Sequence, residues 1–217
     1  TPKGQRFYRR AIEILSHCES AQAEFIGNAP TENKLILGVI NTLPQAIVIK
    51  AVELFKENAP DTRLDIWEGS TSRVESWFSQ KRLDIAVNIV GTLTPNSNLL
   101  HREPLVAVMS PEHPLASLGD TMSIRDLAEY PFIYRSNCEL DSLGRARLKA
   151  EGVKLDVQVK AESDNLAFEF IRTSKSITLA PENLVPSDLS KLKVTGLEIE
   201  RSIGLKWQED APLQIIS

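Results

Sequence analysis

The chain has 217 residues, of which 42% are hydrophobic and 25% charged, and it carries a formal net charge of −4. Its length allows one large domain or two small ones around a sizeable core, and the composition is that of an ordinary soluble globular protein. The charge excludes nucleic-acid binding by the chain as a whole, no apolar run is long enough to span a membrane, and the polar N-terminus is no secretory signal.

A long helix is predicted near the N-terminus, from about Gln5 to Ile26. Its apolar residues recur at alternating intervals of four and three, a period that buries a narrow seam against another helix. These residues are Phe7, Ala11, Ile14, Cys18, Ala21 and Phe25. Two interpretations fit the seam: the helix packs on its own domain, or it forms a dimer with a second copy, which the heptad spacing favours.

Strands and helices alternate from Lys34 onward. The pattern predicts a strand at 34–40, a helix at 43–60, a strand at 62–69, a helix at 70–82 and a strand at 83–90. Two successive strand-helix-strand units predict a parallel sheet with right-handed crossovers. The stretch "GTLTPNSN" at 91–98 is rich in turn residues and is interpreted as a connection between lobes.

The second half of the chain continues the alternation. A strand is predicted from Pro104 to Met109, a short helix from Ser123, a strand ending at Tyr134 and a helix at 140–152. A strand at 154–163, a helix capped by Ser163 or Asp164, a strand at 176–185 and an alternating segment at 196–210 follow. The last segment could return the chain to the first lobe.

The ordered segments together resemble the C-terminal part of a LysR-type transcriptional regulator. The resemblance begins in the "T-x-x-G" stretch at Thr1 and rests on a series that covers nearly the whole chain. The series includes "LGVINTLPQ", "EHPLA", "SIRDLAEYPFI" and "SITLAPENLV". No single motif is specific, whereas their order is. One departure is "SKSITLAP", where the family often has a glycine-rich turn, because serine tolerates a positive φ poorly.

The resemblance implies an α/β, two-lobe periplasmic-binding-protein-like fold of type 2 with an N-terminal linker helix. Residues 1–30 would be the end of the DNA-binding module and the linker helix. Residues 34–98 plus about 205–217 would form regulatory lobe I, and residues 99–204 would form regulatory lobe II.

The resemblance also implies a function. A small, anionic metabolite would bind between the lobes and control DNA binding and transcription, through a DNA-binding module that is missing from this chain. The protein would be a cytoplasmic homodimer or homotetramer without membrane contact. The alternative is an extracytoplasmic solute-binding protein of the same fold, against which the heptad helix argues, because a solute receptor needs no dimerising linker.

Polar residues at the ends of the predicted strands are the candidate effector site. In an open α/β sheet, ligands bind beyond the carboxyl ends of the strands, and hydroxyl and N–H groups at helix starts suit carboxylate or phosphate. The candidates are Asn41, Thr42, Ser70, Thr71, Asn88, Arg135 and Ser136. Each could instead be a plain helix cap. By resemblance, Thr42 and Thr71 fall where other members of the family contact effectors.

Arg135 carries two open interpretations. Its guanidinium could bind an anionic effector through two parallel hydrogen bonds, or it could be an exposed side chain paired with a neighbour such as Glu139.

Residues that usually perform catalysis or bind metals form no recognisable motif. His17, His101 and His113 have no triad or metal spacing, and "GSTS" lacks the lysine and glycines of a phosphate loop. The two cysteines, Cys18 and Cys138, lie far apart, which favours a reducing compartment. The sequence therefore predicts no enzyme activity, no cofactor and no metal.

Overall fold

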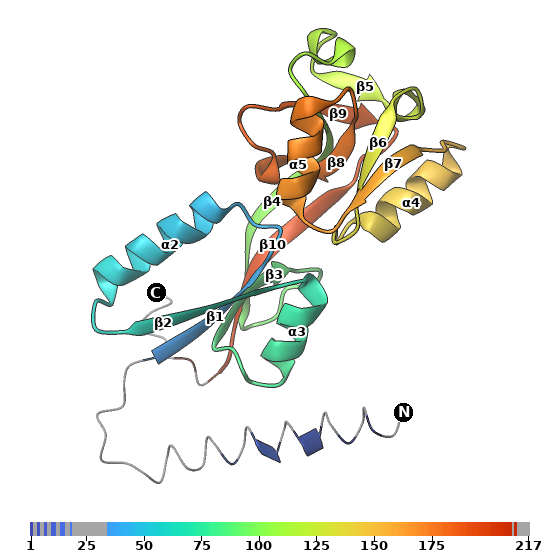
Figure 1. Ribbon diagram of the computed structural model, residues 1–217. Helices are drawn as coiled ribbons and strands as arrows, with labels where there is room; N and C mark the ends of the chain where they lie inside the picture. Colours follow the sequence, from blue (N-terminus) through green and yellow to red (C-terminus); the bar gives the residue numbers. More distant parts are fainter. Residues whose placement is uncertain are drawn as a thin grey trace.

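The computed structural model describes residues 34–209 and 211, together with positions 1, 4, 7, 10, 11, 14, 15 and 18. Figure 1 shows two lobes joined by two long strands, β4 (Ser97–Met109) and β10 (Glu200–Trp207), which run side by side from one lobe into the other. This arrangement confirms the predicted two-lobe α/β class.

The isolated positions described between Gly4 and Cys18 are helical. Two residues of the predicted heptad seam, Phe7 and Ile14, are 77% and 62% exposed in the single chain. At these positions the helix does not pack on its own domain. The remainder of the predicted linker helix, and the residues after Ala211, lie outside the described residues.

The first lobe is built on a sheet with the strand order β2-β1-β3-β10-β4. Strand β1 (Lys34–Ile40) pairs in parallel with β2 (Arg63–Gly69) and with β3 (Ile85–Ile89), which confirms the two predicted strand-helix-strand units. Strand β10 enters antiparallel between β3 and β4 and carries the chain back into this lobe.

Two helices flank this sheet unequally. Helix α3 (Thr71–Ser79) buries Val74 completely and closes a core that contains Ile40 and Leu83. Helix α2 (Gln45–Asn58) faces the other side and has no fully buried residue. The predicted helix at 43–60 is thus present, but the layer between it and the sheet is only partly filled.

The second lobe wraps its sheet around the far half of β4. Strands β8 (Thr178–Pro181) and β9 (Ser190–Thr195) both pair antiparallel with β4. Strand β5 (Thr121–Ser123) extends the sheet beside β9, and the parallel pair β6 (Pro131–Arg135) and β7 (Asp156–Ala161) lies next to β8. Strands β5 and β9 were not predicted from the sequence.

Helices α4 (Asp141–Ala150) and α5 (Asp164–Thr173) pack on the second lobe. Ser163 caps α5, one of the two residues predicted for this role, since its side chain accepts the backbone N–H of Leu166. The 3-10 helices η1 (Pro114–Ser117), η2 (Ile124–Ala128) and η3 (Glu182–Leu184) complete the lobe. Two buried clusters, one containing Leu127 and the other Phe168, form its core.

Strand β4 is longer than predicted, because it begins at Ser97 rather than at Pro104. Its first residues pair with β10 from Ser97–Lys206 to Pro104–Glu200, so their backbone groups are satisfied although their side chains are polar.

The serines of "SKSITLAP" replace a glycine-rich turn without requiring a positive φ. Ser174 has φ −134°, and among the described residues Lys81 is the non-glycine residue with a positive φ.

Candidate ligand site between the lobes

A buried ion pair joins the two strands that cross between the lobes. Arg201 on β10 lies opposite Glu103 on β4, and their side chains are 0% and 2% exposed. Arg201 Nε donates to Glu103 Oε1 at 2.8 Å, and Arg201 Nη2 lies 2.7 Å from the same oxygen. A buried charge is tolerated only when it is paired, so each residue requires the other.

Arg201 also holds the loop that follows β1. Its Nη2 donates to the carbonyl oxygen of Thr42 at 2.9 Å, and its Nη1 donates to Thr42 Oγ1 at 2.7 Å. Thr42 is 1% exposed, while its neighbour Asn41 is only half-buried and donates its backbone N–H to Gly69 O at 2.9 Å. The predicted strand end therefore places one side chain, that of Thr42, inside the polar cluster.

The second lobe completes the cluster with Glu139, from the loop between β6 and α4. Glu139 Oε1 accepts a hydrogen bond from Thr42 Oγ1 at 3.1 Å and another from Arg201 Nη1. The side chain of Glu139 is 7% exposed, and its second oxygen, Oε2, is buried without a hydrogen-bond partner among the described residues. We call Thr42, Glu103, Glu139 and Arg201 the interlobe cluster. It contains one cation and two carboxylates.

A further polar contact beside the cluster joins the second lobe to the crossing strand β4. The backbone N–H of Asn183, in η3, donates to Glu103 Oε2 at 2.7 Å. The side-chain amide of Asn183 lies 2.8 Å from His101 Nε2. Both oxygens of Glu103 are thus used, Oε1 by Arg201 of the crossing strand β10 and Oε2 by Asn183 of the second lobe.

The space between α2 and the sheet forms a cavity of about 270 Å³ next to the interlobe cluster. Apolar side chains make most of its wall, including Leu37 and Val39 of β1 and Val48 of α2. Glu103 lines the cavity, and so does Leu43, the residue after Thr42. Apolar space beside a few fixed polar groups is the usual construction of a small-molecule site.

The other strand-end residues of the first lobe have local partners. Ser70 caps α3 by accepting the backbone N–H of Arg73 at 3.4 Å, and Thr71 begins that helix. Asn88 is fully buried and donates its side-chain amide to Thr71 O at 3.1 Å. The bond from Asn88 joins α3 to β3. Among the first-lobe candidates, Thr42 is the residue whose side chain bonds to the second lobe, through Glu139.

Arg135 and Ser136 also have partners within their own lobe. Arg135 is 3% exposed, and its Nε donates to Asp164 Oδ1 at 2.8 Å while its Nη1 donates to Leu179 O at 2.9 Å. It is thus buried rather than exposed, and its partner is Asp164 rather than Glu139. Ser136 Oγ donates to Ala161 O at 3.2 Å.

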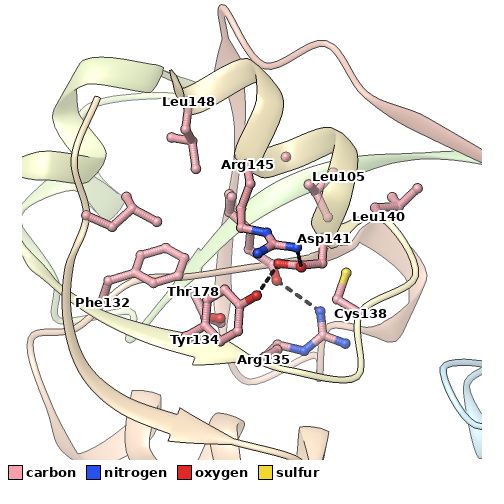
Figure 2. Close-up of a pocket in the computed structure, with 13 residues that line it drawn as sticks. Leu105, Phe132, Tyr134, Arg135, Cys138, Leu140, Asp141, Arg145, Leu148 and Thr178 are labelled. Carbon is pink, nitrogen blue, oxygen red and sulfur yellow. Dashed lines mark hydrogen bonds and ion pairs between the residues drawn. The ribbon is translucent and has the colours of Figure 1, made fainter. Parts of the chain in front are cut away.

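A small cavity of about 50 Å³ lies in the second lobe beneath α4 (Figure 2). Figure 2 shows Tyr134 and Arg145 turned toward Asp141, which binds both. A volume of this size cannot hold a metabolite. Burial raises the pKa of the Cys138 thiol at the edge of this cavity. The protonated thiol is therefore favoured, which is less reactive than the thiolate.

Sequence reasoning missed three members of the interlobe cluster: Glu103, Glu139 and Arg201. A usable signal exists for Arg201, because it occupies a core-facing position in the alternating strand that continues with Ile203. A charge at such a position requires a buried partner. Glu139 carries no signal of this kind, since it lies in a loop and its partners, Thr42 of the first lobe and Arg201 of the crossing strand β10, are distant in sequence.

Within the described part of the chain, no helix combines the length and apolar character required to cross a bilayer. The described residues also contain no group of three or more His, Cys, Asp and Glu side chains arranged to hold a metal ion.

Two α/β lobes connected by two crossing strands define the periplasmic-binding-protein-like class of type 2. The chain belongs to the LysR substrate binding domain family, whose model matches residues 28–215.

Related proteins agree with this assignment. The regulator BenM of Acinetobacter baylyi is 24% identical over 122 residues, which are 55% of this chain and 40% of BenM. YvbU of Bacillus subtilis, an uncharacterised regulator, is 22% identical over 94% of this chain and 66% of its own length. The chain therefore spans about 40% to 66% of these relatives.

A solved structure shows the same fold. The effector-binding domain of QuiR, determined in complex with shikimate, aligns with a TM-score of 0.67 at 20% identity. The alignment covers 85% of this chain and 92% of the QuiR domain.

Proposed function

We propose that this chain is the effector-sensing domain of a LysR-type transcriptional regulator. It binds a small, anionic metabolite between its lobes and thereby controls how a DNA-binding module, outside this chain, engages DNA in the cytoplasm. The observation that carries the proposal is the interlobe cluster, in which Thr42 of the first lobe bonds to Arg201 and to Glu139 of the second. A ligand that enters this junction alters the contacts between the lobes.

Arg201 and Thr42 supply what an anion requires. Arg201 offers a fixed guanidinium, and Thr42 offers a hydroxyl held within hydrogen-bond distance of it. The apolar cavity under α2 adjoins this point through Leu43 and Glu103 and provides room for the rest of a metabolite. The complex of QuiR with shikimate supports a small carboxylic acid as the class of effector.

The signal requires two arrangements of the lobes that bind the effector with different affinity. Strands β4 and β10 cross between the lobes at the interlobe cluster, so a change there acts on the connection itself. The exposed apolar residues Phe7 and Ile14 support pairing of the N-terminal helix with a second copy. A homodimer or homotetramer would transmit the change to the DNA-binding modules. A solute-binding protein of the same fold is disfavoured by the family match and by this helix.

A thermal-shift screen against a library of small carboxylic acids tests the proposal, because a ligand of the native state raises the melting temperature by mass action. Titration calorimetry then measures the affinity of each hit for two variants. Thr42→Val removes the hydroxyl and should weaken binding at least tenfold, roughly the effect of one lost hydrogen bond to a charged group.

Thr178→Val is the matched control, since Thr178 is equally buried and donates its hydroxyl to Ile133 O at 2.7 Å within the second lobe. It should bind the hit as the unaltered protein does. A hit that binds Thr42→Val with undiminished affinity would place the effector elsewhere. A library without any stabilising acid would contradict an anionic effector.

A further inference from the structure

The carboxylate of Glu139 lies where the anionic group of an effector is expected. Its Oε1 is bonded to Arg201 Nη1 and to Thr42 Oγ1 at 3.1 Å, the two groups that make the junction suitable for an anion. The side chain of Glu139 is 7% exposed, and Arg201 and Thr42 are buried as well. In this arrangement the anion position is occupied by a residue of the protein itself.

We propose that Glu139 is an internal ligand, which a carboxylate effector displaces from Arg201 and Thr42. This inference rests on the proposed function, because it assigns the place of the effector's anionic group. Glu139 thereby determines specificity: a ligand must offer a carboxylate, together with further contacts that outweigh those of Glu139.

The charge of the cluster supports displacement rather than addition. One guanidinium already faces two carboxylates, those of Glu103 and Glu139. A third carboxylate beside them would be buried without a cation of its own, which is strongly unfavourable. Exchange of Glu139 for an effector carboxylate keeps the charge of the cluster unchanged.

The two glutamates differ in how firmly they are held, which identifies Glu139 as the one that leaves. Glu103 uses both oxygens, since Oε1 accepts from Arg201 and Oε2 accepts the backbone N–H of Asn183 at 2.7 Å. Glu139 uses only Oε1, and its buried Oε2 has no partner among the described residues. Release of Glu139 into water restores the hydration of that oxygen, which reduces the cost of its displacement.

Displacement also changes the connection between the lobes. Glu139 belongs to the second lobe, and it bonds to the first-lobe residue Thr42 and to Arg201 on the crossing strand β10. An effector that replaces it removes these two contacts and substitutes its own. Recognition of the anion and the change between the lobes are then the same event.

Chemical rescue by acetate tests the proposal without knowledge of the effector. Glu139→Ala removes the internal carboxylate and leaves a space between Arg201 and Thr42. Acetate matches the methylene and carboxylate groups that Glu139→Ala removes, so it should fill this space. It should raise the melting temperature of Glu139→Ala in a saturable manner, compared with chloride at the same concentration. The unaltered protein should show no saturable response, and Glu112→Ala, which removes an exposed glutamate, should respond as the unaltered protein does.

Two further variants make the result decisive. The double variant Glu139→Ala/Thr42→Val should lose the rescue, because it lacks the hydroxyl that binds the anion. If Glu139→Ala does not fold, Glu139→Asp provides the measurement, since its shorter side chain keeps the charge but reaches Arg201 poorly. Acetate should then stabilise Glu139→Asp more than the unaltered protein.

The outcomes separate this proposal from the proposed function. An acetate response of Glu139→Ala or Glu139→Asp that equals that of the unaltered protein overturns the internal-ligand proposal, even if a metabolite binds the native domain. A carboxylate effector that binds Glu139→Ala less tightly than the unaltered protein also overturns it, because displacement requires tighter binding. Saturable rescue by acetate supports it, even if the metabolite screen yields no effector.

Discussion

Removal of Arg201 should be among the most destabilising single substitutions in this domain. The guanidinium is fully buried and lies 2.7 Å from Glu103 Oε1. At an effective dielectric constant of about 20, one such contact is worth roughly 6 kcal/mol, which is largely offset by several kcal/mol of desolvation for each ion. Arg201→Met keeps much of the volume but leaves the buried carboxylates of Glu103 and Glu139 without their cation. We expect it to lower the free energy of unfolding by about 3 to 5 kcal/mol.

Urea denaturation followed by circular dichroism measures this loss, and an exposed ion pair supplies the control. Arg172 bonds to Asp188 with side chains that are 30% and 56% exposed, so Arg172→Met should cost about 1 kcal/mol or less. The double variant Arg201→Met/Glu103→Met should lose less than the sum of the two single variants, by about 1 to 3 kcal/mol. An Arg201→Met variant as stable as Arg172→Met would refute the reasoning that the pair is buried and mutually dependent.

Three smaller predictions concern other parts of the fold. A Cβ at Gly204 would lie 2.5 Å from Val90 Cγ1 and 2.8 Å from the backbone oxygen of Asn98, so Gly204→Ala should cost about 1 to 3 kcal/mol in urea denaturation. Ser123→Ala removes the capping box of η2 and should cost about 1 kcal/mol in the same assay. Burial lowers the pKa of His113 below its ordinary value of 6.5, so its contribution to stability is complete above that pH and declines as the pH falls below it. His113→Gln should flatten this part of a curve of melting temperature against pH. An unchanged curve would show that His113 does not cause the loss of stability below pH 6.5.

The fold could largely be predicted because its signals are local. The apolar run of β1, the turn residues before α3 and the cap at Ser163 each mark one element, and the strand-helix-strand order then predicts the parallel pairing of β1 with β2 and β3. Strand β9 was missed because it is short and has no continuous apolar run, although its buried Leu192 and Val194 alternate with exposed lysines as in a half-buried strand; it pairs with β4 and with β5. The start of β4 at Ser97 was also missed, because its residues are mostly polar and their strand partner, β10, lies about a hundred residues away in sequence.

The candidate site was less predictable, because its geometry depends on contacts between distant segments. Thr42 is a candidate from the rule that polar groups end buried strands, and in the structure it contacts residues 97 and 159 positions away. Ser70 satisfies the same rule, yet its side chain caps a helix. Nothing in the residues around Glu139 indicates that its carboxylate meets an arginine of the crossing strand.

The balance of charge at the junction limits which ligands can act on this domain. With Glu139 in place, Arg201 is saturated and Glu139 Oε2 is the buried polar atom of the cluster that still lacks a partner among the described residues. A neutral ligand that donates a hydrogen bond to Oε2 would strengthen the contact between the lobes, whereas a carboxylate that displaces Glu139 would break it. The two ligand classes therefore act on the same contact in opposite directions. A domain that senses carboxylates through this junction should thus be antagonised by neutral analogues of its effector, in which a primary amide replaces the acid.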